Sequence, residues 1–81
     1  MSTVIRTIVR LYCMVKFPTR LKELRVEKKL SQEGLARKIN VSTSAVRHWE
    51  SGVRTPTAPY VVALADYFGV STDFLLGRTD Y

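Results

Sequence analysis

Hydrophobic residues after Pro18 recur at intervals of three and four, the spacing of one helix face, and short polar stretches separate the hydrophobic ones. This pattern predicts five short helices, at about residues 19–28, 32–39, 43–51, 58–68 and 72–76. Turns of only a few residues separate them, which is typical of helices packed as a bundle. The sequence therefore predicts an all-α domain.

The ends of the predicted helices carry local signals. Each helix begins just after a residue whose hydroxyl can accept a hydrogen bond from the first turn: Thr19, Ser31, Ser42, Thr57 and Ser71. The last four helices are followed by residues that tolerate a left-handed backbone: Asn40, Gly52, Gly69 and Gly77. Lys29 stands at the corresponding place after the first helix, where a left-handed lysine is strained by about 1–2 kcal/mol.

The same spacing predicts which side chains face the core. They are Leu21, Leu24, Leu30, Leu35, Ala36, Ile39, Val41, Ala45, Val46, Trp49, Ala58, Val61, Val62, Leu64, Ala65 and Phe68. Tyr60 and Tyr67 are interpreted as packing residues rather than as residues that stack on bases.

The N-terminal segment has a different pattern, so the chain divides into an extension, residues 1–16, and a domain, residues 17–81. Alternate positions are apolar if the segment is extended, through Ile5, Val9, Leu11, Cys13, Val15 and Phe17; a helix fits loosely, through Val4, Ile5, Ile8, Val9 and Tyr12. The β-branched content favours an extended segment that pairs with a strand of another chain. The domain is then expected to fold without residues 1–13.

Composition adds an electrostatic argument. The 81 residues suffice for one small domain, and 46% hydrophobic with 25% charged residues is the balance of a globular protein. The net charge is +6, and it is uneven: residues 1–54 carry +8 and residues 55–81 carry −2. This basic balance favours a polyanionic partner, nucleic acid or an anionic membrane surface. The alternative is that the charge only keeps the protein in solution.

Several classes of protein are excluded by what the sequence lacks. Cys13 and His48 are the only residues of their types, so the chain has no disulfide framework and no zinc pattern, which fits a reducing cytoplasm. No apolar run is long enough to span a bilayer, and no signal peptide is present. There is no nucleophile–base pair, phosphate-binding glycine loop or metal cluster, so we expect neither an enzyme nor a cofactor. A chain of this size also has no room for a small-molecule pocket of its own.

Residues 31–52 predict a helix–turn–helix. Two helices are joined by a three-residue turn, residues 40–42, and the small Ala36 stands where the helices cross. Helices held at a steep angle leave the outer face of the second one projecting, a shape that fits the major groove of B-DNA. A generic pair of amphipathic helices has similar apolar spacing, but the small residue, Asn40 in the turn and the cap at Ser42 together favour the helix–turn–helix.

From about Phe17 to Asp80 the chain resembles the phage repressor and Cro-like helix–turn–helix family, also called the xenobiotic-response-element family of bacterial regulators. The matching stretches are RLKELR at 20–25, LSQEGLARKINVSTSAVRHWESG at 30–52, RTP at 54–56, LADYFGVS at 64–71 and DFLLGRTD at 73–80. The resemblance implies a five-helix, lambda-repressor-like DNA-binding domain. Residues 1–16 match nothing in the family. Met14 stands near where many members begin, so it is an alternative start of the chain.

The resemblance also implies site residues. In the family the first residue of the second helix contacts phosphate, which is Gln32 here, and the exposed part of the third helix reads bases, which here means Thr43, Ser44, Arg47 and His48. An Arg and an acidic residue form an ion pair between the first and third helices, at positions that correspond to Arg25 and Glu50.

The chemistry of the residues agrees with these implied roles. Arg47 can donate two hydrogen bonds to a guanine edge, and His48 can bond a base or a phosphate. Arg54 and Thr55 follow the third helix and can hold phosphate through side chains or backbone N–H groups. The phosphate-binding set is Gln32, Ser42, Arg54, Thr55 and Lys38. For each charged residue the alternative is an ordinary solvated side chain.

The function that follows is sequence-specific DNA binding by a transcriptional regulator, a repressor of phage, plasmid or mobile-element type in the bacterial cytoplasm. The expected partner is a pseudo-palindromic operator bound by a homodimer, with neither a membrane nor a small-molecule ligand. The expected dimer interface is the fifth helix, around Phe74 and Leu75, or the N-terminal segment. Two alternatives remain: the DNA-binding antitoxin of a toxin–antitoxin pair, with residues 1–17 holding the toxin, and a protein-interaction module on the same fold.

Overall fold

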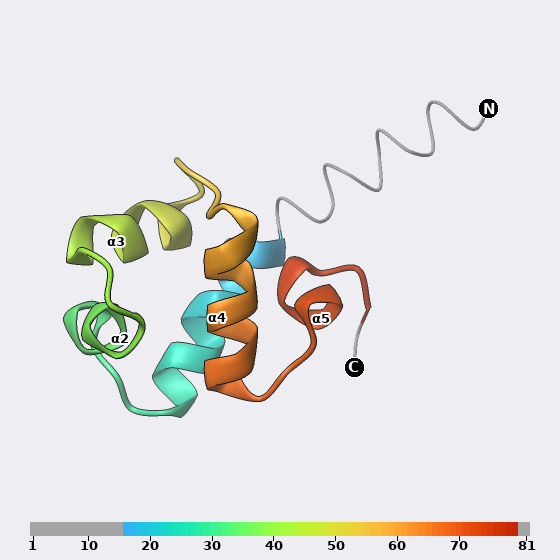
Figure 1. The fold of residues 1–81 in the computed structure, drawn as a ribbon, viewed down its shortest axis with the longest axis horizontal. Helices are drawn as coiled ribbons and strands as arrows, with labels where there is room; N and C mark the ends of the chain where they lie inside the picture. The colour runs from blue at the N-terminus through green and yellow to red at the C-terminus, as the bar shows by residue number, and fades with distance from the viewer. Residues whose placement is uncertain (1–15, 80–81) are drawn as a thin grey trace.

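The computed structural model describes residues 16–79, and these residues are helical without any strand (Figure 1). A first helix covers residues 16–27. It is followed by α2 (Gln32–Ile39), α3 (Thr43–Ser51), α4 (Ala58–Phe68) and α5 (Thr72–Leu76). The predicted all-α fold is confirmed. The expected extended segment and the alternative start at Met14 lie outside the described residues.

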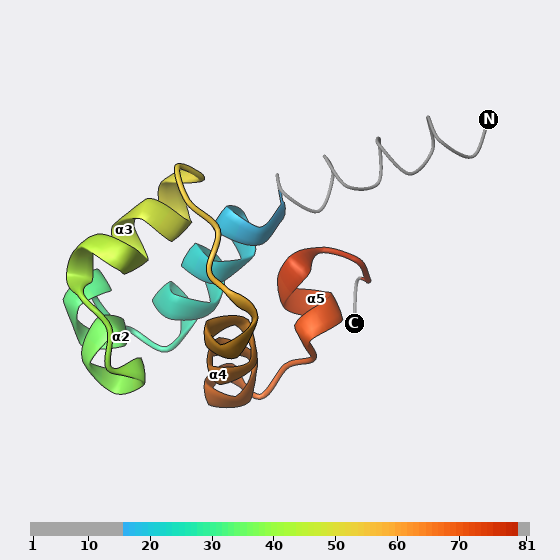
Figure 2. The same ribbon diagram turned by 45° about the horizontal axis from the view of Figure 1, so that its top comes forward.

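The helices form a small bundle with the two central ones at its middle. α2 and α3 lie at one end, α5 lies at the other, and α4 and the first helix pass between them (Figures 1 and 2). Each helix contributes one side chain that is completely buried: Leu21, Leu35, Val46, Leu64 and Leu75. Full burial of a side chain of this size stabilises the fold by about 1.5–3 kcal/mol. These five residues therefore hold all the helices to one core.

The predicted helix ends are confirmed at α2, α3 and α5. Ser31, Ser42 and Ser71 each accept a hydrogen bond from the backbone N–H three residues later, at 2.9–3.1 Å. All four later helices end at a residue with a left-handed backbone, namely Asn40, Gly52, Gly69 and Gly77. At α4, Thr57 occupies the cap position, but its side chain makes no cap hydrogen bond.

The expected start of the first helix is wrong. Lys16, Phe17 and Pro18 are already helical, so Thr19 lies within the helix and does not cap it. The physical reason is tertiary. Phe17 and Leu21 stand four residues apart, share one helix face and are both buried in the core. A helical backbone through residue 17 brings both side chains of this face inward, whereas an extended one separates them.

The predicted inner face of α4 is too wide. Val61, Leu64, Ala65 and Phe68 are buried, but Ala58 is exposed and Val62 keeps 49% of its surface. This helix is apolar on nearly every side, and only a stripe with three- and four-residue spacing can face the core. The side chains beside that stripe remain in solvent.

α5 is tied to the first helix by long-range contacts. The Arg20 guanidinium donates hydrogen bonds to the carbonyl groups of Phe74 and Thr79, and its Cζ lies 4.3 Å from the centre of the Phe74 ring. A Cβ on Gly77 would lie 2.5 Å from Lys16 Cβ, so only glycine permits this approach. Leu75 has no exposed surface. Of the two α5 residues expected at a dimer interface, Leu75 is therefore buried within one chain, whereas Phe74 is half-buried.

The turn after the first helix contains a strained lysine. Lys29 has φ of 58°, close to the 60° of Asn40, and these two are the described non-glycine residues with positive φ. Asparagine adopts this conformation with little strain, whereas lysine is strained in it.

We predict that Lys29→Gly raises the free energy of unfolding by about 1 kcal/mol, because glycine adopts this conformation without strain. Thermal unfolding should then shift upward by about 4–8 °C.

Asn40→Gly is the matched control for this substitution. It removes a side chain at nearly the same φ, but it relieves less strain, so the melting temperature should rise by much less. An equal effect of the two substitutions would contradict the assignment of strain to Lys29.

Candidate nucleic-acid interface

The turn between α2 and α3 fixes how the two helices cross. Asn40 takes the left-handed conformation, and the Val41 N–H donates to the Ala36 carbonyl at 2.9 Å, which closes the end of α2. Ala36 is 2% exposed, so its small side chain is buried beside this turn. α2 and α3 pack directly against each other. The turn and the small residue together hold α3 against α2.

α3 has a buried face and an outer face. Val46 and Trp49 point into the core. Ser44 and Arg47 are exposed, and Thr43 and His48 are half-buried beside them. The structure therefore brings the four expected base-reading residues together on the outer side of α3.

A bidentate ion pair joins the first helix to the end of α3. Arg25 Nε donates to Glu50 Oε2 at 2.6 Å, and Nη2 donates to Oε1 at 3.0 Å. The two side chains are only 12% and 5% exposed. Arg25 Nη1 also donates to the Leu30 carbonyl at 2.7 Å. The hydrogen bond to Glu50 and the charge of that carboxylate raise the pKa of Arg25 although burial opposes the shift. The guanidinium thus stays charged.

Gln32 is attached to this ion pair. It is the first residue of α2, and its Nε2 donates to Glu50 Oε1 at 3.3 Å. The side chain is half-buried. One of the two amide hydrogens is therefore engaged within the protein.

A groove of about 420 Å³ lies between α3 and the start of α4. Its lining comes from α3, the following loop and the first turn of α4: Ser42, Ser44, Ala45, His48, Trp49, Arg54, Thr55, Pro56, Thr57 and Tyr60. None of these residues is acidic, and five carry hydroxyl groups. The groove therefore offers hydrogen-bond donors and positive charge without a carboxylate that would repel an anion.

Five of the expected site residues line this groove, and the others do not. Ser42, Ser44, His48, Arg54 and Thr55 meet there. The Arg54 backbone N–H donates to the His48 carbonyl at 3.3 Å, so only the side chain of Arg54 is available to a phosphate.

Lys38 stands apart from the other expected phosphate-binding residues. It lies in the last turn of α2, six residues and about 9 Å along the helix axis from Gln32. There it is exposed and interacts favourably with the negative end of the helix dipole.

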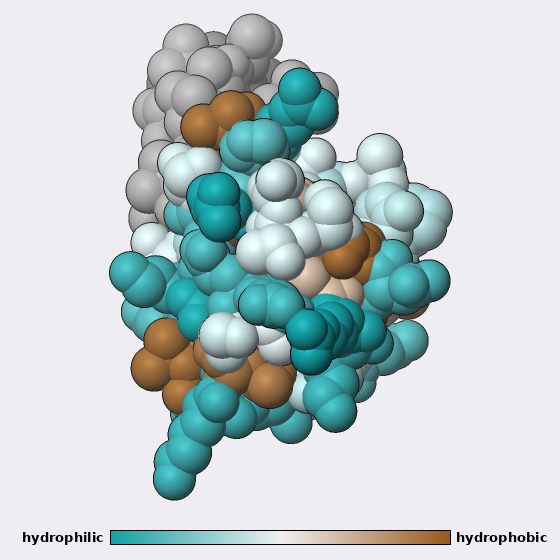
Figure 3. Space-filling model, turned by 90° about the vertical axis from the view of Figure 1, so that its left-hand side faces the viewer, coloured by the Kyte–Doolittle hydropathy of each residue, from teal (hydrophilic) through white to brown (hydrophobic). Residues whose placement is uncertain are grey.

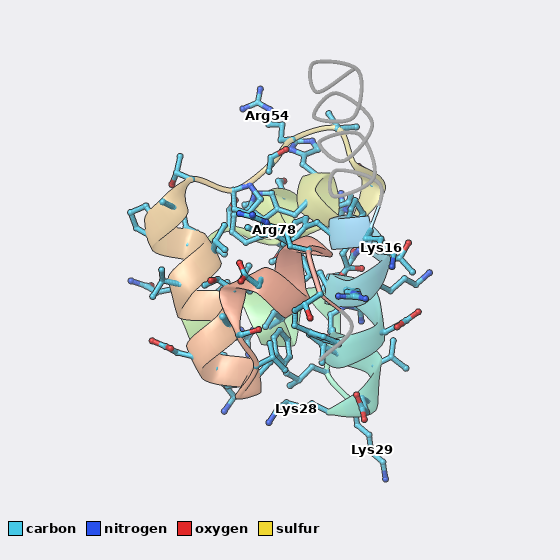
Figure 4. The ribbon with its side chains drawn as sticks, turned by 90° about the vertical axis from the view of Figure 1, so that its right-hand side faces the viewer. Lys16, Lys28, Lys29, Arg54 and Arg78 are labelled. Carbon is cyan, nitrogen blue, oxygen red and sulfur yellow. The ribbon has the colours of Figure 1, made fainter. Side chains whose placement is uncertain are left out.

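The basic side chains of the domain do not form a single patch. Figure 4 shows Arg54 at the opposite end of the molecule from Lys28 and Lys29. Hydrophilic side chains cover most of the α2–α3 end, with separate hydrophobic patches between them (Figure 3). The positive charge near α3 therefore comes from a few residues, chiefly Arg47 and Arg54.

The described residues show neither a metal site nor a membrane span. No group of three or more His, Cys, Asp or Glu side chains in residues 16–79 is placed to hold a metal ion. Within the same residues, no helix has the length and hydrophobicity needed to cross a membrane.

Comparison with known proteins identifies the family. The sequence model of a helix–turn–helix family matches residues 21–75, which reach from within the first helix into α5. The chain belongs to the xenobiotic-response-element family of helix–turn–helix proteins. This family consists of DNA-binding transcriptional regulators and not of enzymes.

Three relatives illustrate the similarity. The HTH-type transcriptional regulator YobD of Bacillus subtilis is 37% identical over 70 residues, which are 86% of this chain and 58% of YobD. The HTH-type transcriptional activator BcrR of Enterococcus faecalis is 37% identical over 62 residues, or 76% of this chain and 30% of BcrR. The HTH-type transcriptional regulator ImmR of Bacillus subtilis is 33% identical over 61 residues, or 75% and 48%. The chain thus spans between about a third and three fifths of these relatives.

Two residues of the groove were missed as site residues from the sequence. Thr57 was expected only as a helix cap, and Tyr60 only as a packing residue, whereas both line the groove and Tyr60 is 42% exposed. A signal was present in the sequence. Thr57 and Pro59 mark the beginning of α4 directly after the loop with Arg54, so Tyr60 had to lie in the first turn beside that loop.

The Arg25–Glu50 pair leads to a prediction about stability. Arg25→Ala and Glu50→Ala each leave a buried charge without its partner, so each should lower the free energy of unfolding by about 3 kcal/mol. The Arg37–Glu33 pair is a matched control, because its 2.6 Å contact is as short but its side chains are 77% and 62% exposed. Arg37→Ala should cost at most about 0.5 kcal/mol.

Urea unfolding of the three variants measures these differences. Equal midpoints for Arg25→Ala and Arg37→Ala would show that the buried pair does not stabilise the fold.

Proposed function

We propose that this chain is a sequence-specific DNA-binding transcriptional regulator that inserts the outer face of α3 into the major groove. The observation that carries the proposal is this outer face, where Ser44 and Arg47 project into solvent beside Thr43 and His48 while Val46 and Trp49 hold the helix to the core. An α-helix fits the major groove, where every base pair presents a different pattern of donors and acceptors.

The site residues divide into those that read bases and those that hold phosphates. Arg47 is exposed one turn after Thr43, so both face the same side of the helix. A bidentate contact between Arg47 and guanine supplies about 1–3 kcal/mol of discrimination. Arg54 lies in the loop beyond α3 and meets only the backbone. Gln32 and Ser42, at the starts of α2 and α3, are further phosphate contacts, to which Lys38 adds non-specific attraction.

We propose that the chain represses transcription and that its gene comes from a phage, plasmid or other mobile element. The support is the proposed mode of binding, since a domain that occupies promoter DNA blocks access to it without contacting another protein. The name of BcrR states activation for that relative. The test is a reporter gene placed under an operator that the chain selects from random DNA. Production of the chain lowers the reporter's expression if the chain is a repressor and raises it if the chain is an activator.

The functional unit is proposed to be a homodimer on a pseudo-palindromic operator. One recognition helix covers only a few base pairs, which is too few to select one genomic site. Two copies one DNA turn apart, about 34–36 Å, double the number of bases that are read.

The division of roles between Arg47 and Arg54 generates a prediction. With a duplex selected from random DNA, Arg47→Ala should weaken binding by about 1–3 kcal/mol on the selected duplex, and the preference at one base position should disappear. Arg54→Ala should weaken binding equally on selected and scrambled duplexes, and the dependence of log affinity on log salt should become shallower by about 1.

Salt titrations of both variants on both duplexes are the measurement. Equal losses for Arg47→Ala on the two duplexes would make Arg47 a phosphate contact, and base reading would then rest on Thr43, Ser44 and His48. Absence of any selected sequence for the unmodified chain would refute the proposed function itself.

The dimer is tested by the spacing of the half-sites. Two chains should bind one operator, as measured by sedimentation. An insertion of half a DNA turn between the half-sites, about five base pairs, should abolish the second binding event, because it moves that half-site to the other face of the duplex. An insertion of one full DNA turn returns the second half-site to the same face of the duplex. Binding of a single chain to an asymmetric half-site would contradict the dimer.

A further inference from the structure

We propose that Tyr60 is a further DNA-contacting residue, whose hydroxyl donates a hydrogen bond to a backbone phosphate of the strand that enters the groove between α3 and α4. The inference deepens the proposed function and rests on it. It assigns to this tyrosine a role that neither the helix–turn–helix motif nor the charge pattern indicates.

The position of Tyr60 is the first argument. Tyr60 lies in the first turn of α4, on the opposite wall of the groove from Ser44 and His48. It keeps 42% of its surface exposed, although it belongs to a helix whose inner stripe is completely packed. With α3 in the major groove, as proposed above, the flanking strand passes along this side chain.

The Tyr60 ring packs against the ring of Trp49. Its centre lies 5.8 Å from that of Trp49, with the two ring planes tilted by 42°. Trp49 is itself only 5% exposed, so the supporting ring belongs to the core. A tilted pair of this kind is a favourable aromatic arrangement. A ring that is already fixed loses little conformational freedom when its hydroxyl binds a ligand.

The Tyr60 hydroxyl is a donor that the protein does not use. Among the described residues it takes part in no hydrogen bond. Around it the groove carries Arg54, Thr55 and Thr57, without an acidic residue among its lining. This surface complements an anion that needs several hydrogen-bond donors, which is the chemistry of a phosphate in the sugar–phosphate backbone. A free phosphate ion has the same chemistry, but it is too small to fill the groove, whereas a DNA strand extends along it.

The test uses Tyr60→Phe, which removes only the hydroxyl and keeps the ring on Trp49. We expect binding to weaken by about 3- to 10-fold on selected and scrambled duplexes alike, as for one lost hydrogen bond to a phosphate. The salt dependence should stay unchanged, because a neutral hydroxyl releases no counterion, in contrast to Arg54→Ala. The melting temperature should also stay the same.

Tyr67→Phe is the matched control. Tyr67 lies in the same helix, but its ring packs against Phe68 at 5.2 Å and under Lys28, and it does not line the groove. Its variant should bind DNA like the unmodified chain. A duplex with one uncharged methylphosphonate at the contacted position gives a second readout: on that duplex Tyr60→Phe should cause no further loss.

Each outcome is decisive. Unchanged affinity of Tyr60→Phe, while the unmodified chain binds its selected duplex, overturns the inference and leaves the proposed function intact. A loss confined to the selected duplex makes Tyr60 a base-reading residue and also overturns the phosphate assignment. Failure of the unmodified chain to bind any duplex refutes both proposals together.

Discussion

The ion pair between Arg25 and Glu50 is the interaction on which the α3 end of the molecule depends. It joins the first helix to the last turn of α3 with two hydrogen bonds, and the same guanidinium holds the carbonyl of Leu30, where the chain turns toward α2. Gln32 at the start of α2 donates to the same carboxylate. One buried carboxylate thus fixes three segments relative to each other, and the direction in which the outer face of α3 points follows from that arrangement.

The ends of the helices and the packing of α4 fix the rest of the bundle. Serine caps begin α2, α3 and α5 at defined positions and left-handed residues end them, which leaves short connections between the helices. α4 packs its stripe against both ends of the bundle, and its first turn closes the groove beside α3. The groove beside α3 is therefore formed by three segments that the core holds together, rather than by α3 alone.

Local signals explain why much of this could be predicted from the sequence. The bounds of α2 and α3 were predicted because each end carries its own cap, and the outer face of α3 follows from helical spacing. Features that depend on distant contacts could not be predicted. The helix through Phe17 is stabilised by burial beside Leu21, and Arg20 binds carbonyl groups more than fifty residues away. The exposure of Val62 depends on which side of an almost uniformly apolar helix meets the core.

The central claim is that DNA is bound by the outer face of α3 and the groove beside it. The most direct measurement is a titration of the isotope-labelled chain with its selected duplex, followed through the backbone amide chemical shifts. The account predicts the largest shifts at the start of α2, along α3 and in residues 53–60, with small shifts in α5 and on the outer side of the first helix. Shifts concentrated on α5 and the first helix, with α3 unaffected, would contradict it.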